Sequence, residues 1–258
     1  MRWTAGAVRI ARDVLRRMAQ VELLDRVYVI AAGTFVSALP VLLLLTGVLG
    51  SSRRSESVFA AQLIGRLGLG GPAADAVRTL LPASRLRLYV VGLGISLFGL
   101  YSLTRRVARA YSAIWQIPDL PRSRWWRAGV WLLVELAAIV SVAVARDLAR
   151  ESTPVARVAL FVLALIIWYA AELAGQRLIT DGRVPWRALH LAAGLTAAGR
   201  LGVAIWAAVY LGTSMTRQAE LYGPIGVVFA LFTSLFASIA ATLVATLIAA
   251  TVTAKSAD

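Results

Sequence analysis

The chain has 258 residues, of which 59% are hydrophobic, and its net charge of +14 comes from 26 arginines and a single lysine. Soluble domains are about 45–50% apolar, so this composition excludes an ordinary soluble fold, and arginines that flank apolar runs favour lipid headgroups over nucleic acid as partners. The absence of cysteine excludes disulfides and thiolate sites, and a single histidine, His190, argues against a metal cluster. We therefore expect a membrane protein without a cofactor.

Residues 1–26 are predicted to form a basic amphipathic helix on the cytoplasmic side. Apolar residues recur at helical spacing on one side of this stretch, and arginines crowd the other. The apolar positions are Val8, Ala11, Val14, Leu15, Met18 and Val21, and the arginines are Arg9, Arg12, Arg16 and Arg17. This pattern indicates a helix lying on the membrane surface; the alternative is a helix packed beneath the bundle.

Six apolar stretches are long enough to cross a bilayer, which takes about 20 residues of helix. They lie at 27–50, 87–104, 128–146, 155–176, 187–212 and 222–252. With the N-terminus inside, the inner segments carry 16 arginines and lysines and the outer segments 10, so we predict cytoplasmic termini. The expected fold is an all-α bundle of six transmembrane helices over residues 27–252, followed by a short cytoplasmic tail, 253–258.

The first outer loop, 51–86, is the longest connection. Its apolar spacing predicts two short amphipathic helices, separated by the Gly-Leu-Gly-Gly-Pro run at 68–72. Because irregular backbone is not tolerated in hydrocarbon, we expect this hairpin to lie at the outer interface. Trp125, Trp126, Trp186 and Tyr222 are placed where interfacial aromatic residues belong.

Four ionisable residues fall inside predicted spans, where each costs about 2.5–3.5 kcal/mol on insertion scales. They are Glu135, Glu172, His190 and Arg200. One interpretation is a polar cavity or relay that opens to the cytoplasm, in which Arg200 contacts an anion or headgroup and the carboxylates are counter-charges or proton carriers. The alternative is a buried ion pair of Arg200 with Glu135 or Glu172 that sets helix register, while Glu172 and His190 reach the interface.

Pro40 lies in the first span, where proline removes a backbone hydrogen bond and kinks a helix. Ser37, one turn earlier, is a candidate to satisfy the freed backbone group. The kink either lines a cavity or only shapes the packing.

Two further sets of residues have alternative uses. The small residues Gly92, Gly94, Ser96 and Gly99 in the second span, and Gly194, Ala198 and Gly202 in the fifth, predict close helix packing, with dimerisation as the alternative. Arg105, Arg106 and Arg109, at the inner end of the second span, are candidates for binding anionic headgroups, or they only control topology.

Four short stretches, in order, resemble the YihY/BrkB family of bacterial inner-membrane proteins, once labelled ribonuclease BN. They read AAGTFVSALP at 31–40, SLTRRVARAYSAIW at 102–115, GRVPWR at 182–187 and YGPIG at 222–226. The family's usual Gly-Ala-Glu element near the end of the last span is replaced by VATLIA at 244–249, which has no acid.

The resemblance implies a six-helix bundle of the bacterial plasma membrane linked to envelope integrity. We expect a protein that handles a lipid or another amphiphilic anion, with membrane lipids, a homo-oligomer or an envelope protein as partners. The alternative is a structural scaffold that transports nothing. No catalytic motif is present, so we do not expect an enzyme, and one histidine without an acidic metal cluster fits poorly with a ribonuclease.

Overall fold

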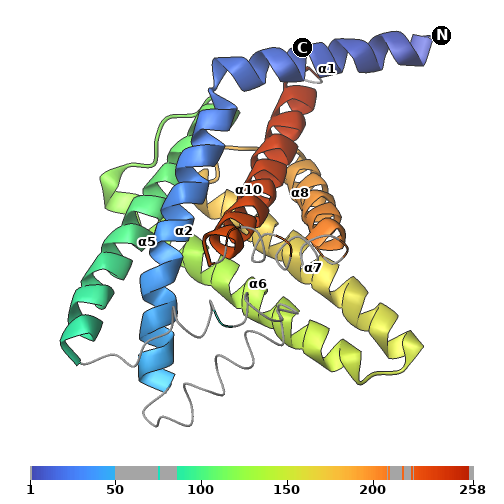
Figure 1. The fold of residues 1–258 in the computed structure, drawn as a ribbon. Helices are drawn as coiled ribbons and strands as arrows, with labels where there is room; N and C mark the ends of the chain where they lie inside the picture. Colours follow the sequence, from blue (N-terminus) through green and yellow to red (C-terminus); the bar gives the residue numbers. More distant parts are fainter. Residues whose placement is uncertain are drawn as a thin grey trace. The chain divides into compact units, whose positions relative to one another are not determined.

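The computed structural model describes residues 2–49, 75, 86–207, 209, 217, 222 and 224–255, and within these ranges it contains helices and no strand (Figure 1). The α-helices are α1 (Arg2–Gln20), α2 (Leu23–Leu49), α5 (Leu86–Trp115), α6 (Trp126–Arg150), α7 (Pro154–Ile179), α8 (Trp186–Trp206) and α10 (Pro224–Lys255). A 3₁₀ turn, η1 (Arg122–Arg124), precedes α6. The predicted all-α class is confirmed.

Within the described residues, four segments are long and apolar enough to cross a membrane. They are Arg122–Arg150, Pro154–Ile179, Trp186–Trp206 and Val228–Ala254, and they match the third to sixth predicted spans. The first predicted span, 27–50, falls on α2 up to Leu49, and the second, 87–104, lies inside α5. The count of six spans and the cytoplasmic termini stay predictions. Apart from Asp75 and Leu86, the outer hairpin lies outside the described residues.

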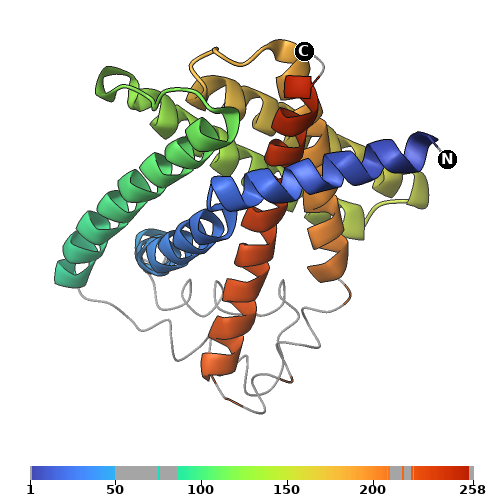
Figure 2. The ribbon, with the colours of Figure 1, turned by 90° about the horizontal axis from the view of Figure 1, so that it is seen from above.

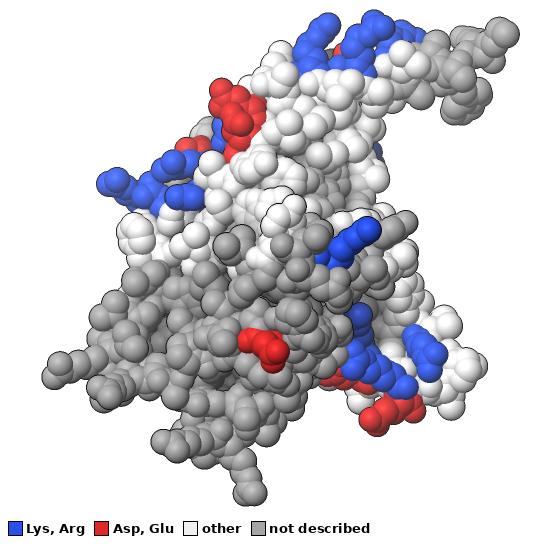
Figure 3. Space-filling model, in the orientation of Figure 1, with Lys and Arg blue, Asp and Glu red and all other residues white. Residues whose placement is uncertain are grey.

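The outward faces of α6 and α7 are apolar. Leu133, Val140, Val155 and Val158 are 60–81% exposed. Many neighbouring aliphatic side chains are also exposed, to a smaller extent. On the side shown in Figure 3, basic side chains gather at the top and charged side chains at the lower right, and few charges lie on the white surface between them. A large exposed apolar surface bounded by charge is expected of helices solvated by acyl chains.

The chain divides into two compact units. The first contains Met1–Val27, Thr104–Leu201 and Ala240–Asp258, and the second contains Tyr28–Leu103 and Gly202–Ile239. In the second unit, Tyr28 and Phe35 of α2 contact α10: the Tyr28 and Phe236 rings lie 4.8 Å apart, and those of Phe35 and Phe232 lie 6.0 Å apart. Edge-to-face and tilted aromatic pairs of this kind stabilise helix contacts.

In the first unit, α6 and α7 form an antiparallel hairpin. Thr153 caps α7 by accepting a hydrogen bond from the Ala156 amide, and Pro154 follows at the first helical position, where its missing N–H costs nothing. The two helices approach closely because Gly175 has no side chain: a Cβ there would lie 2.6 Å from Cδ1 of Trp131. Glycine therefore sets the distance between the helices near the buried charges described below.

The N-terminal helix α1 lies across the C-terminal part of α10 in both views (Figures 1 and 2). Val14 of α1 is buried, whereas Val8 and Leu15 are 57% and 65% exposed. Exposed apolar side chains are what a helix on the membrane surface would present to acyl chains, and the interfacial position of α1 stays a prediction.

Hydroxyl side chains along α10 bond to the helix's own backbone. Each donates to the carbonyl oxygen four residues earlier at 2.8–3.0 Å. The residues are Thr233, Ser234, Ser238, Thr246, Thr251 and Thr253. Such bonds satisfy a hydroxyl donor without a partner on another helix.

Candidate functional site

Three of the four predicted charged residues meet in the interior of the first unit, each from a different helix. The Nη1 of Arg200 in α8 lies 3.1 Å from Oε2 of Glu135 in α6, and its Nη2 contacts Oε1 of Glu172 in α7. The side chains of Arg200, Glu135 and Glu172 are 19%, 10% and 1% exposed. We call these residues the buried triad.

Helix geometry explains how side chains at different depths reach one another. Arg200 lies 14 residues after the start of α8, or about 21 Å along its axis, whereas Glu172 lies seven residues, or about 10 Å, before the end of α7. Side chains on a helix tilt toward its N-terminus, so Arg200 extends back toward the end where α8 begins. Its long side chain thus meets the two carboxylates.

Two other protein groups also contact the Arg200 guanidinium. Its central carbon lies 4.3 Å from the ring centre of Trp168, a cation–π contact, and its Nε lies 3.5 Å from the Thr242 hydroxyl of α10. Glu135 and Glu172 thus contact both terminal nitrogens of Arg200, and their negative charges oppose the approach of the predicted anion. The structure agrees with the ion-pair alternative, and Arg200 pairs with both carboxylates rather than one.

The charges of the triad do not balance. Two carboxylates surround one guanidinium, so the cluster carries a net charge of −1 when all three residues are ionised. An unbalanced charge in a poorly solvated interior is costly, and binding one proton would remove it. The arrangement is thus chemically suited to hold an exchangeable proton.

A polar chain extends from the triad along α7 and α10. Gln176 donates to Oε2 of Glu172 at 3.4 Å and to the Thr246 hydroxyl at 3.3 Å. The Tyr111 hydroxyl, from α5, also bonds Thr246, and the Tyr111 side chain is buried. This chain lies in the part of α7 nearest its end, which is the cytoplasmic end in the predicted topology.

The sequence interpretation missed the neutral members of this chain. Gln176 is four residues after Glu172, so the two side chains share one helix face. That spacing could have predicted the contact between them. Nothing in the sequence pointed to Trp168 or Tyr111, because tryptophan and tyrosine in apolar segments usually serve packing.

His190 does not join the triad. Its Nδ1 lies 2.5 Å from the Tyr169 hydroxyl, its ring lies 6.0 Å from that of Trp186, and its side chain is exposed. Glu172, in contrast, is buried, so the interpretation that it reaches the interface is wrong while that for His190 agrees with the structure. Within the described residues, no three His, Asp or Glu side chains gather as a metal-binding group.

Ser37 does not bond the carbonyl that Pro40 leaves without a partner. Its hydroxyl donates to the Gly33 carbonyl oxygen at 2.7 Å, whereas proline at position 40 frees the carbonyl of Val36. The proposed compensation at the kink is therefore wrong. Ser37 instead packs against Gly99 of α5, where an added Cβ would lie 2.3 Å from its Oγ, so Gly99 does serve close packing.

The other predicted small residues behave differently. Gly194 and Gly202 have no heavy atom within 4 Å of an added Cβ, and Ala198 is exposed, so the expectation that this stripe packs in the core is wrong for the described part of the chain. The buried face of α8 instead carries Ala192, Ala193, Thr196 and Ala197. Gly92, Gly94 and Ser96 lie in α5, and an added Cβ at Gly94 meets nothing.

Arg105, Arg106 and Arg109 are all exposed on α5, as headgroup binding and topology control both require.

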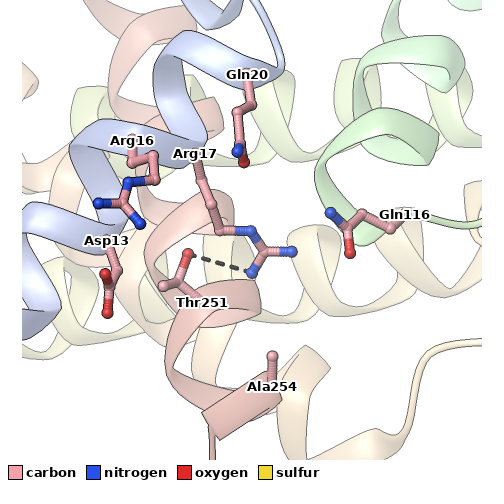
Figure 4. Close-up of a pocket in the computed structure, with 7 residues that line it drawn as sticks. All are labelled: Asp13, Arg16, Arg17, Gln20, Gln116, Thr251 and Ala254. Atoms are coloured by element: carbon pink, nitrogen blue, oxygen red, sulfur yellow. Dashed lines mark hydrogen bonds between the residues drawn. The ribbon is translucent and has the colours of Figure 1, made fainter.

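A cavity of about 340 Å³ lies between α1, the end of α5 and the end of α10 (Figure 4). The figure shows Arg17 reaching between Thr251 and Gln116; its Nη1 donates to the Thr251 hydroxyl at 3.4 Å. Arg16 and Asp13 complete its charged lining.

Helices with exposed apolar faces and a buried charge cluster define the class: the chain is an α-helical membrane protein. The family model described as "Virulence factor BrkB" matches residues 14–258, and the chain belongs to this family. The family resemblance seen in the sequence is thereby confirmed. No curated protein and no solved structure matches the chain.

Proposed function

We propose that this protein is a six-span protein of the bacterial plasma membrane, with both termini in the cytoplasm, that handles a lipid or another amphiphilic anion in the maintenance of the envelope. In this proposal the buried triad does not bind the anion. It binds a proton, and the protonation state of the triad selects between two arrangements of α6, α7 and α8.

One observation carries the proposal: two carboxylates share one guanidinium at a depth where charge is costly. A purely structural pair needs one carboxylate, because the second adds an uncompensated charge. The charged and titratable groups around this excess charge are Arg200, Glu135, Glu172 and Tyr111, and all come from separate helices. Gain or loss of a proton therefore changes the attraction between these helices.

The competing function is a scaffold that transports nothing. The close packing at Gly175 and the contact of Arg200 with Trp168 favour it, because a rigid triad would only fix helix register. The two functions differ in whether lipid movement occurs and whether it depends on pH.

The test is reconstitution of the full chain in liposomes that contain a fluorescent phospholipid in both leaflets. Dithionite added outside bleaches the outer leaflet, so the bleached fraction reports lipid movement. We expect movement by the wild type to vary with pH, and Glu172→Gln to abolish that dependence because the excess negative charge is gone. Glu151→Gln, an exposed carboxylate at the α6–α7 turn, is the matched control and should behave as the wild type.

Absence of lipid movement at every pH, in protein that is folded by circular dichroism, would favour the scaffold. Movement with the same pH dependence in Glu172→Gln and in the wild type would refute the role of the triad.

A further inference from the structure

Three arginines converge on a single carboxylate at the end of α7. Asp181 contacts Nη1 of Arg124, lies 2.5 Å from Nη1 of Arg127 and lies 3.7 Å from Nη2 of Arg183. The Asp181 side chain is 5% exposed, whereas those of Arg124, Arg127 and Arg183 are 52%, 27% and 37% exposed. We call this group the Asp181 arginine cluster. The carboxylate is thus covered, whereas the three arginine side chains are partly open to the surroundings.

The backbone holds the carboxylate in place. Asp181 and Gly182 both adopt left-handed backbone conformations, with φ of 54° and 72°, in the turn that ends α7. Arg177 clamps this turn by donating from Nη1 to the carbonyl oxygens of Gly182 at 2.8 Å and Val184 at 3.0 Å. Arg183 is tied to the preceding loop by a bond from Nη1 to the Pro118 carbonyl at 3.0 Å. The turn thus fixes Asp181, the loop bond fixes Arg183, and Asp181 in turn holds Arg124 and Arg127.

The cluster is strongly positive. Three guanidinium groups against one carboxylate leave a net charge of +2, and the two segments 116–127 and 177–187 together carry six arginines and two aspartates, a net charge of +4. The N-terminal ends of α6 and α8 lie in the same segments, and neither helix has an acidic residue in its first turn. These two helix dipoles add positive potential, whereas the C-terminal end of α7 in the same segment adds negative potential, so the net positive charge comes from the arginines.

Exposed tryptophans accompany the cluster. Trp125 and Trp126 adjoin η1 and α6, Trp186 begins α8, and the three are 57%, 53% and 52% exposed. The Arg127 guanidinium lies 5.6 Å from the Trp126 ring. Exposed tryptophans in membrane proteins lie at headgroup depth, so the cluster should face the phosphate layer of the bilayer.

We propose that the Asp181 arginine cluster is a binding site for a terminal phosphate group, which has two ionisable oxygens, either as the phosphate monoester of a lipid headgroup or as free phosphate. Arginine forks bind phosphate oxygens through paired N–H donors, and a fixed fork loses less entropy on binding than a mobile one. Asp181 contacts only some of the N–H groups of the three arginines. It holds the remaining N–H groups in position to bind a phosphate. This site goes beyond the proposed function, since it depends neither on the triad nor on transport.

The experiment is calorimetric titration of the full chain, in a neutral detergent, with three soluble probes. Dihexanoyl phosphatidic acid carries a phosphate monoester, dihexanoyl phosphatidylcholine masks its phosphate with choline, and inorganic phosphate has no lipid part. We expect phosphatidic acid to bind more tightly than phosphatidylcholine. Arg124→Gln combined with Arg183→Gln should weaken binding at least about tenfold, the size of one charge-assisted hydrogen bond. This pair leaves Asp181 bonded to Arg127.

The matched control is Arg146→Gln with Arg150→Gln, which removes two exposed charges near the other end of α6 and should leave the affinity unchanged. Glu151→Gln should also bind as the wild type, and because the readout is affinity and not lipid movement, failure of this site is distinguishable from failure of the proposed function. Equal binding of phosphate and phosphatidic acid would identify free phosphate as the ligand. Arg124→Lys with Arg183→Lys replaces the glutamine pair if that pair fails to fold, and should weaken binding at least about threefold. Unchanged affinity in every folded variant of Arg124 and Arg183 would overturn the proposal, as would equal affinity for phosphatidylcholine.

Discussion

Replacement of Arg200 by methionine isolates the energetics of the buried triad. Methionine keeps much of the side chain's apolar volume but leaves Glu135 and Glu172 facing each other without a cation. Removing one partner of a buried ion pair typically costs about 3–5 kcal/mol, because the remaining charge is uncompensated. Here two carboxylates lose their partner, so we expect a loss of free energy of unfolding of at least this size.

Neutralising the acids should reverse most of that loss. The triple variant R200M/E135Q/E172Q contains no buried charge at the triad, so it should recover to within about 1–2 kcal/mol of the wild type. E172Q alone keeps a balanced pair of Arg200 with Glu135 and should cost about 1 kcal/mol, the size of an ordinary hydrogen bond.

The assay is equilibrium unfolding in mixed micelles of a neutral detergent and dodecyl sulfate, followed by circular dichroism. E151Q is the control, because an exposed substitution should change the free energy of unfolding by less than about 0.5 kcal/mol. A wild-type stability for R200M would refute the reasoning. So would a triple variant no more stable than R200M, since the loss would then come from packing and not from charge.

Two further predictions concern the α6–α7 hairpin. Gly175→Ala should destabilise the fold by about 1–3 kcal/mol in the same unfolding assay, because its Cβ would lie 2.6 Å from Trp131 and the indole must move; Gly194→Ala, which meets nothing within 4 Å, should be neutral or stabilising, and equal effects would contradict the packing argument. Thr153→Ala should lower the free energy of unfolding by about 1 kcal/mol through loss of the helix cap, and should increase hydrogen exchange in the first turn of α7. Thr153→Ser keeps a hydroxyl and should behave as the wild type in both measurements. An unchanged exchange rate in the alanine variant would show that the cap is not formed.

Apolar length was sufficient to predict the four helices of the described residues that are long and apolar enough to cross a membrane. The span predicted at 155–176 corresponds to α7 at Pro154–Ile179, and that at 128–146 to α6 at Trp126–Arg150. The observed helices are longer because their polar ends continue the backbone hydrogen bonding past the apolar stretch. Hydropathy records only the apolar part.

The site was less predictable than the helices. The cost of charge in a span drew attention to Arg200 and the two acids, but their pairing depends on how three helices are rotated relative to one another. The Asp181 arginine cluster was invisible for another reason. Arg124 and Asp181 are 57 residues apart, and arginines near span ends are ordinarily counted only as topology signals.

The hydroxyl groups along α10 have a consequence for biogenesis. A composition scale scores every serine and threonine in this helix as polar. Six of these hydroxyl groups nevertheless already donate to a carbonyl oxygen within the same helix: those of Thr233, Ser234, Ser238, Thr246, Thr251 and Thr253. The nascent helix thus presents less unsatisfied polarity to the translocon than its residue count suggests. Alanine at Thr233 or Ser234 would ease its partitioning only slightly, whereas asparagine, whose amide brings more donors than the local backbone can accept, would hinder it.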